Sequence, residues 1–177
     1  MDLRMVKTRK QIKEAFLTLR TKLMPEKIKV KDICEVAMIN KTTFYNHYAD
    51  SAQLSDEIDD FAIDKVMSGF SEKDRIFDDP KVYIIGLLRA LEHEASYLKI
   101  VFRGKQDVLC SKLGERLHRY YDGRVKGVED GVKLSFAIGG FVSVVKDHLL
   151  NETNYDISTL AETTALMVEP LLRRAGA

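Results

Sequence analysis

Residues 30–48 have the sequence VKDICEVAMINKTTFYNHY, and the spacing of their apolar side chains predicts two short helices joined by a tight turn. Asn40 is a favourable N-cap for the second helix, because its side-chain oxygen can accept a backbone N–H of the first turn. A helix of barely two turns is not stable alone, so we expect Phe44 and Tyr48 to anchor it by packing.

A longer amphipathic helix is predicted just before this pair. Within residues 8–23 the apolar side chains fall on one stripe at helical spacing, and most of the basic side chains lie elsewhere. Pro25 ends this helix. Three helices in this order, the last two short and closely joined, are the pattern of a helix-turn-helix, whose second helix enters the major groove of DNA.

The net charge of +1 conceals two oppositely charged blocks. Residues 1–48 contain 11 basic and 5 acidic residues, whereas residues 49–80 contain 3 basic and 10 acidic ones. A compact basic segment favours a polyanionic partner, since neutralisation of phosphates by Lys and Arg dominates the affinity of proteins for nucleic acids. Charge alone leaves a second interpretation open, in which the basic side chains only solubilise one face.

The segment also resembles a known family. Residues 30–48 look like part of the N-terminal DNA-binding domain of the TetR family of bacterial transcriptional regulators, and TFYNHY at 43–48 is similar to that family's TFYxHF core. The resemblance implies an all-α fold. It places a three-helix helix-turn-helix DNA-binding domain in residues 1–49 and a larger helical effector-binding and dimerisation domain in residues 50–177.

Three positions depart from the family pattern. The usual turn glycine is Met38, which we expect to adopt a positive φ at a cost of about 1 kcal/mol. Lys29 stands where a hydroxyl residue commonly caps the second helix, and it offers a cation to phosphate instead. The lysine often found at the start of the fourth helix is absent from residues 50–53.

The resemblance also implies which residues contact DNA. The start of the second short helix can face base edges and phosphates, and the positions that follow it match backbone or base contacts. The expected DNA-binding residues are Lys29, Lys31, Asn40, Lys41, Thr42, Thr43, Tyr45, Asn46 and His47. The lysines in this set also fit a purely solubilising role.

Five further helices are expected after residue 49. They span residues 50–68, opened by Asp50 and Gln53, then 80–102, opened by Asp79 and Pro80, then 106–121, 132–150 and 156–172. The first of these is acidic, and we expect most of its carboxylates to face water. Residues 132–150 are apolar on nearly every face through their centre, as expected of a helix covered by its own core and by a partner chain.

These features predict a homodimer held by a four-helix bundle, as the resemblance also implies. The expected dimer-interface residues are Phe141, Val145, Leu160, Met167 and Leu171. TetR-like regulators usually hold a small-molecule effector among the helices of the second domain. Its expected lining is Phe61, Met67, Leu87, Leu91, Phe102 and Phe136, although each is at helical spacing and fits the core better than a pocket.

Other classes of function lack the residues that they need. The four histidines form no HExxH or i,i+4 pair, and no P-loop, GxSxG or GxGxxG motif is present. We therefore expect no enzyme activity, no metal and no cofactor. Two distant cysteines and a charged N-terminus indicate a cytoplasmic protein, and the uncharged residues 134–145 are too few to cross a membrane.

The sequence thus predicts a TetR-like regulator that binds a palindromic operator in double-stranded DNA and is a repressor released by a ligand. The alternative is a helical interaction protein of the same fold that acts through a protein partner. The departures at Met38, Lys29 and residues 50–53 motivate this alternative.

Overall fold

The computed structural model describes residues 3–150 and 155–172, which contain helices and no strand. The all-α prediction is confirmed. The helices are α1 (Leu3–Arg20), α2 (Val30–Val36), α3 (Lys41–Tyr45), α4 (Ser51–Ser68), α5 (Pro80–His93), α6 (Ala95–Val101), α7 (Gln106–Tyr121), α8 (Gly127–Leu150) and α9 (Ile157–Leu172). Three short 3-10 turns, η1 (Pro25–Lys27), η2 (Glu72–Arg75) and η3 (Asp122–Arg124), lie in the connections.

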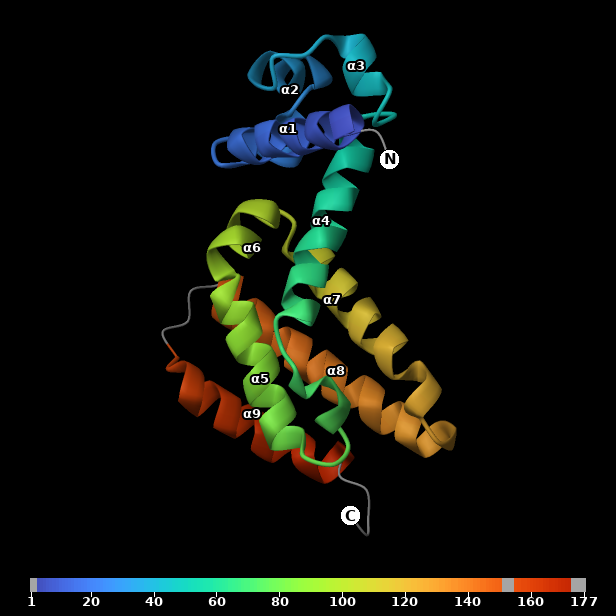
Figure 1. The fold of residues 1–177 in the computed structure, drawn as a ribbon. Helices are drawn as coiled ribbons and strands as arrows, with labels where there is room; N and C mark the ends of the chain where they lie inside the picture. The colour runs from blue at the N-terminus through green and yellow to red at the C-terminus, as the bar shows by residue number, and fades with distance from the viewer. Residues whose placement is uncertain (1–2, 151–154, 173–177) are drawn as a thin grey trace.

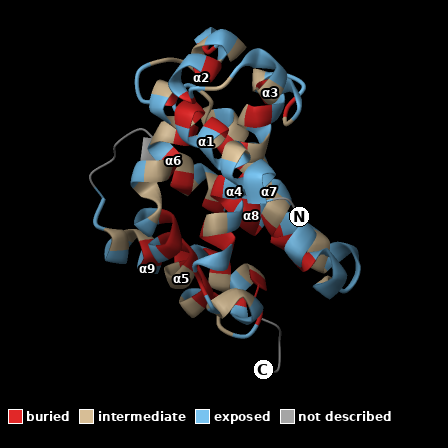
Figure 2. Cartoon of the chain, turned by 45° about the horizontal axis from the view of Figure 1, so that its top comes forward, coloured by how far each residue is buried: buried red, intermediate tan, exposed pale blue. Residues whose placement is uncertain are grey.

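Helix α4 connects the two ends of the molecule (Figure 1). Helices α1, α2 and α3 pack together at one end, and α5, α7, α8 and α9 form a bundle at the other, with α6 near the junction. The buried residues form a continuous core along the chain, lying between the helices rather than on their outer sides (Figure 2).

Side-chain caps set several helix starts where the sequence predicts them. Asn40 Oδ1 accepts the Thr43 N–H at 2.7 Å, and Asp50 Oδ1 accepts the Gln53 N–H at 2.7 Å. Asp79 Oδ1 accepts the backbone N–H two residues after Pro80, at 3.2 Å. Each carboxylate or amide oxygen satisfies a donor that the first helical turn leaves without a partner.

Three helix predictions were wrong in their extent, and one of them is α8, which begins at Gly127 rather than at residue 132. Helix α1 begins at Leu3 rather than residue 8, because its first turns are exposed and carry no apolar stripe that would mark them. The predicted helix over residues 80–102 is two helices, since the chain leaves helical geometry at Glu94 (φ −94°, ψ 4°). Its carboxylate accepts a hydrogen bond from Lys65 of α4 at 2.7 Å, and α6 turns to pack against α1 and α4.

The acidic helix α4 is paired along its length with cations of α7. Lys112 Nζ lies 2.6 Å from Asp56 and 2.7 Å from Asp60, and Arg116 forms an ion pair with Asp64. We call these contacts the α4–α7 ion-pair ladder. Asp56, Asp60 and Asp64, which were expected to face water, are therefore partly exposed but ion-paired within the chain, whereas Asp59 of the same helix is buried and paired with Lys105.

Candidate nucleic-acid interface and regulatory surfaces

The core of the N-terminal end fixes α3 in place. Phe44 and Tyr48 are 0% and 2% exposed, and their ring centroids lie 5.8 Å apart. They pack with buried Ile12 and Phe16 of α1 and Ile33 of α2. Helix α3 is only five residues long and is not stable alone. The packing of these two rings therefore fixes its orientation, with the opposite side facing solvent.

The predicted DNA-binding residues lie on α3, beside it in the chain, and at the start of α2, and most of them are exposed. Thr43 and His47 are half-buried, and the exposed members are Lys29, Lys31, Asn40, Lys41, Thr42, Tyr45 and Asn46. Among the residues that the structure covers, the three lysines have no salt bridge. The surface therefore presents cations, hydroxyls and amides together, which suits contacts to phosphates and base edges.

The turn between α2 and α3 is strained as the sequence predicts. Met38 has φ 53°, the single positive φ of a non-glycine residue in the described chain, and its side chain is 89% exposed. Lys29 makes no side-chain cap for α2. Its backbone N–H donates to Asp32 Oδ2 at 3.1 Å instead, which leaves its ammonium available on the surface.

An ionic network joins α1, α3 and α4 behind this surface. Glu57 of α4 accepts hydrogen bonds from Arg9, and Lys13 lies 2.6 Å from the same carboxylate. Arg9 Nε also donates to the Tyr48 hydroxyl at 3.1 Å, and burial raises the pKa of Tyr48 to about 12. Tyr48 is therefore neutral at physiological pH and accepts the hydrogen bond from Arg9 as an uncharged hydroxyl.

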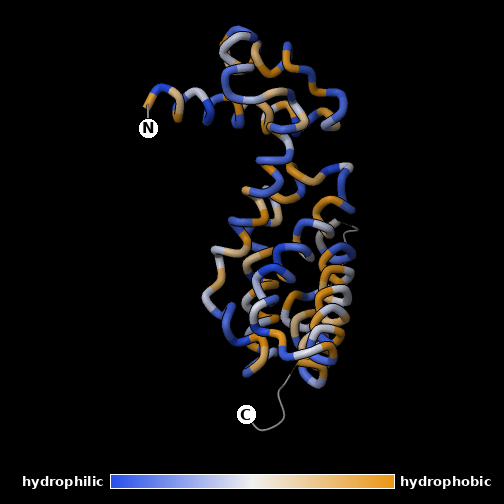
Figure 3. The backbone as a smooth tube through the Cα atoms, turned by 90° about the vertical axis from the view of Figure 1, so that its right-hand side faces the viewer, coloured by the Kyte–Doolittle hydropathy of each residue, from blue (hydrophilic) through white to orange (hydrophobic). Residues whose placement is uncertain are grey.

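The first turns of α1 are a basic helical extension that the sequence analysis counted in the basic block of residues 1–48 but did not predict as helix. They extend past the other helices at the N-terminal end (Figure 3), and Lys7 and Lys10 lie exposed on them. The signal was present in the sequence, because residues 3–13 contain no acidic side chain. It was missed because α1 was expected to begin only at residue 8.

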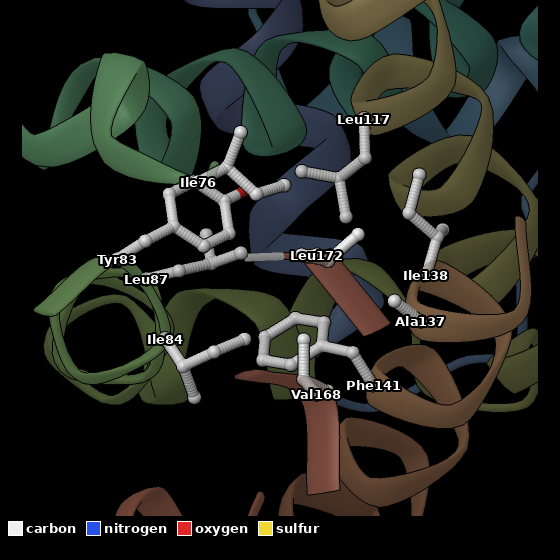
Figure 4. Close-up of a pocket in the computed structure, with 10 residues that line it drawn as sticks. All are labelled: Ile76, Tyr83, Ile84, Leu87, Leu117, Ala137, Ile138, Phe141, Val168 and Leu172. Carbon is white, nitrogen blue, oxygen red and sulfur yellow. The ribbon is translucent and has the colours of Figure 1, made fainter. Parts of the chain in front are cut away.

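A small cavity lies between α5, α7, α8 and α9 (Figure 4). Its volume is about 10 Å³, which is what a single water needs, and the lining is otherwise apolar. Ten residues line it: Ile76, Tyr83, Ile84, Leu87, Leu117, Ala137, Ile138, Phe141, Val168 and Leu172. Tyr83 is the one lining residue whose side chain carries a polar atom, and its hydroxyl is not exposed to the cavity.

The Tyr83 hydroxyl is buried without a hydrogen bond of good geometry. Burial raises the pKa of Tyr83 well above its usual value. The neighbouring ring of Tyr121 lies 5.8 Å away between centroids, but its own hydroxyl donates to the carbonyl of Lys73 at 2.9 Å. The hydroxyls of Tyr83 and Tyr121 nevertheless interact, and this contact affects the pKa of both groups.

The structure brings few of the predicted effector-pocket residues together. Leu87 lines the cavity, whereas Met67, Leu91 and Phe102 are buried elsewhere in the core. Phe61 and Phe136 were misplaced, since they are 51% and 73% exposed and lie on the outer surface. Helical spacing identified them as apolar but did not say which side of each helix faces inward.

The outer face of α8 and α9 carries a stripe of exposed apolar and small residues. We call it the α8–α9 face, and its members are Val132, Phe136, Gly139 and Gly140 on α8 and Thr163, Leu166 and Met167 on α9. Leu166 and Met167 are 72% and 70% exposed. A Cβ added at either glycine would meet open space, so another backbone can approach closely there.

Two of the predicted interface residues belong to the core instead. Phe141 and Val145 are each 2% exposed, and Phe141 lines the cavity. They face the chain's own helices because the inward stripe of α8 passes through them. Met167 is exposed, and Leu160 and Leu171 are half-buried at the edge of the α8–α9 face.

Across the described residues, no group of three or more His, Cys, Asp or Glu side chains is placed to hold a metal ion. No helix within residues 3–150 or 155–172 is both long and apolar enough to cross a membrane.

No protein-family model and no curated protein matches the chain. Among solved structures, it is similar to the dihydroxyacetone kinase operon activator DhaS, with a TM-score of 0.59, 15% identity, and coverage of 94% of this chain and 97% of that one. It is also similar to RolR in complex with resorcinol, with a TM-score of 0.54, 20% identity and coverage of 97% and 96%.

A third similar structure is a TetR transcriptional regulator from Rhodococcus sp. RHA1, with a TM-score of 0.53, 13% identity, and coverage of 94% of this chain and 95% of that one. The chain has the TetR fold. The likeness runs over nearly the whole length, so it extends the resemblance seen in residues 30–48 to the helices beyond them. The TetR fold places α3 as the second helix of the helix-turn-helix.

Proposed function

We propose that the protein is a cytoplasmic, homodimeric transcriptional regulator of the TetR type, which binds a palindromic operator and performs no enzymatic reaction. The observation that carries this proposal is the exposed surface of α3. Lys41, Thr42 and Asn46 are exposed there, while Phe44 of the same short segment is buried and anchors it. Residues 1–49 are the DNA-binding unit, and residues 50–177 carry dimerisation and the response to a signal.

Selection from random duplexes, followed by titration of the selected operator, tests the DNA-binding function. The logarithm of the binding constant should fall with the logarithm of salt concentration with a slope of several units, since several phosphates are neutralised. Equal affinity for every duplex would contradict the operator, and the absence of DNA affinity would favour the protein-partner alternative.

Three alanine variants separate the roles of the α3 surface. Lys41→Ala should weaken binding to all sequences similarly, because a lysine on phosphate carries no sequence information. Thr42→Ala and Asn46→Ala should relax base preference at particular positions, by about 1–3 kcal/mol each where the contact is direct. Unchanged binding in all three variants would refute the assignment of α3.

The α8–α9 face is the proposed dimer interface. Its exposed apolar residues and its two glycines suit close packing against the same face of a second copy, and a two-fold dimer matches the symmetry of a palindrome. A dimer presents two copies of α3 to the two half-sites.

The proposed signal is a compact, uncharged, mainly apolar molecule with one hydrogen-bonding group, received beside Tyr83. The cavity there has a volume of only about 10 Å³, so such a ligand must separate the helices that line it and thereby favour another conformation. RolR was solved in complex with resorcinol, a compact aromatic molecule that carries two hydroxyl groups. Complete release of an operator requires about 5.5 kcal/mol of differential affinity between the two states.

Thermal unfolding with phenol, benzene and benzoate tests this site. Phenol should raise the melting temperature more than benzene, and benzoate should not raise it. Tyr83→Phe should remove the advantage of phenol over benzene, whereas the control Tyr120→Phe, at a surface tyrosine, should keep it. No stabilisation by phenol or benzene would overturn the small-molecule signal and favour control by a protein partner.

A further inference from the structure

A buried arginine lies where the helix-turn-helix meets the rest of the chain. Arg20, the last residue of α1, is 0% exposed. Its guanidinium donates to the carbonyl oxygens of Leu23 at 2.9 Å, Val101 at 3.0 Å and Arg103 at 2.6 Å. Val101 ends α6, so Arg20 places a cation at the end of a helix whose last carbonyls have no partners within it.

The contact is reciprocal. Arg103, just beyond the end of α6, donates from Nη1 to the carbonyl of Thr21, just beyond the end of α1, at 3.0 Å. At the C-terminal end of each helix, a backbone carbonyl therefore accepts a hydrogen bond from an arginine at the end of the other helix. We call the two side chains the arginine clamp.

The segment after α6 is also fixed by its neighbours. Gly104 has φ +74°, and a Cβ built there would lie 2.7 Å from Sδ of Met24, so no other residue fits without strain. Lys105 Nζ then lies 2.6 Å from Asp59 Oδ2 and 3.0 Å from Ser55 Oγ, both on α4. Five residues, 101–105, thus contact α1 and α4 at once.

The chemistry of the clamp indicates orientation rather than stability. Arg20 has no carboxylate among its hydrogen-bond partners, and its Nε makes no hydrogen bond, so burial of this charge is expensive. A guanidinium offers donors in a rigid plane, and it satisfies carbonyls on two helices only when these helices hold one relative position. An apolar side chain would fill the same space without this directional requirement.

We propose that the arginine clamp fixes the angle between α1–α3 and the helices beyond α4, and thereby sets the distance between the two recognition helices of the dimer. Arg20 is a positioning residue, because it acts through the placement of α3 and does not touch DNA. This inference rests on the proposed function, since it requires a dimer that reads two half-sites.

Operator spacing measures this role directly. The selected operator, the same operator with one or two base pairs inserted between its half-sites, and an isolated half-site are titrated with the full-length protein. Wild-type protein should prefer the native spacing by about tenfold or more, and Arg20→Met should reduce this preference to about threefold or less. Its affinity for the isolated half-site should remain that of the wild type.

Lys22→Met is the matched control, because it removes an exposed cation two residues from Arg20 and should leave the spacing preference unchanged. Arg103→Met is the second test, since Arg103 is exposed and its loss spares the core even if Arg20→Met fails to fold. It should relax the spacing preference in the same direction.

Two results would overturn the clamp. In the first, folded Arg20→Met or Arg103→Met keeps the wild-type spacing preference, while operator binding itself stands. In the second, both variants lose affinity for the isolated half-site in proportion to the decrease in their melting temperatures, which indicates a structural role only. A wild-type protein without sequence-selective binding would instead refute the proposed function, and the clamp with it.

Discussion

Met38 lowers the stability of the turn between α2 and α3 because of its backbone conformation. Its φ of 53° is unfavourable for a side chain with a Cβ, and a side chain that is 89% exposed gains little from packing. Met38→Gly should therefore raise the free energy of unfolding by about 0.5–1 kcal/mol, after the entropy of glycine in the unfolded chain is allowed for. Urea denaturation measures it, and Met38→Ala, which keeps the Cβ, should give no such gain.

Glu57 is the second residue with a measurable energetic role. Partial burial raises its pKa, but hydrogen bonds from Arg9 and Lys13 outweigh that effect, and the net pKa lies below its ordinary value. A lowered carboxylate pKa contributes stability above the unfolded-state pKa, and this contribution is lost as pH falls through the folded-state pKa. Glu57→Gln should cost about 1 kcal/mol at pH 7, and its difference from the wild type should shrink in acid. A pH-independent difference would contradict this account.

At the scale of elements, α3 depends on its cap because it has only five residues. Asn40→Ala removes the acceptor for the Thr43 N–H and should lower the free energy of unfolding by about 1 kcal/mol. The neighbouring Lys41→Ala makes no such change in a cap, so its melting temperature should stay close to that of the wild type. Equal destabilisation by both variants would show that the cap is not what matters.

The start and end of most helices could be predicted because they depend on local chemistry. Asn40, Asp50 and Asp79 each cap a backbone N–H within three residues, which is legible in the sequence. The break at Glu94 could not be predicted, since it depends on Lys65, which lies 29 residues away along the chain. The early start of α1 was missed because exposed turns have no apolar period.

At the scale of the whole molecule, the two sides of α8 predict opposite outcomes for the same substitution. Phe136→Lys places a charge on the α8–α9 face, so it should separate the dimer while leaving the monomer folded. Phe141→Lys places a charge in the core and should instead unfold the chain. Sedimentation and thermal melting distinguish the two, and Leu3→Lys, at another exposed apolar residue, is the control that should remain dimeric.

The composition of α8 indicated a helix that is covered by apolar contacts on two sides. It did not indicate which residues pack in the core and which lie on the α8–α9 face. Phe136 and Phe141 are both aromatic and five positions apart, and either fits a core or an interface by its sequence. Their exposed fractions, 73% and 2%, follow from the orientation of α8 about its own axis, which decides which side faces the neighbouring helices. That orientation is fixed by packing between distant segments, which no local pattern records.

The α4–α7 ion-pair ladder also governs what an approaching nucleic acid encounters before any contact is made. An acidic helix directly behind a DNA-reading surface would repel the phosphates that this surface attracts. Because Lys112 and Arg116 supply two positive charges to three of its carboxylates, the repulsive field of α4 is reduced close to its source. The lysines around α3 then dominate the long-range potential, and the benefit is a faster encounter with DNA.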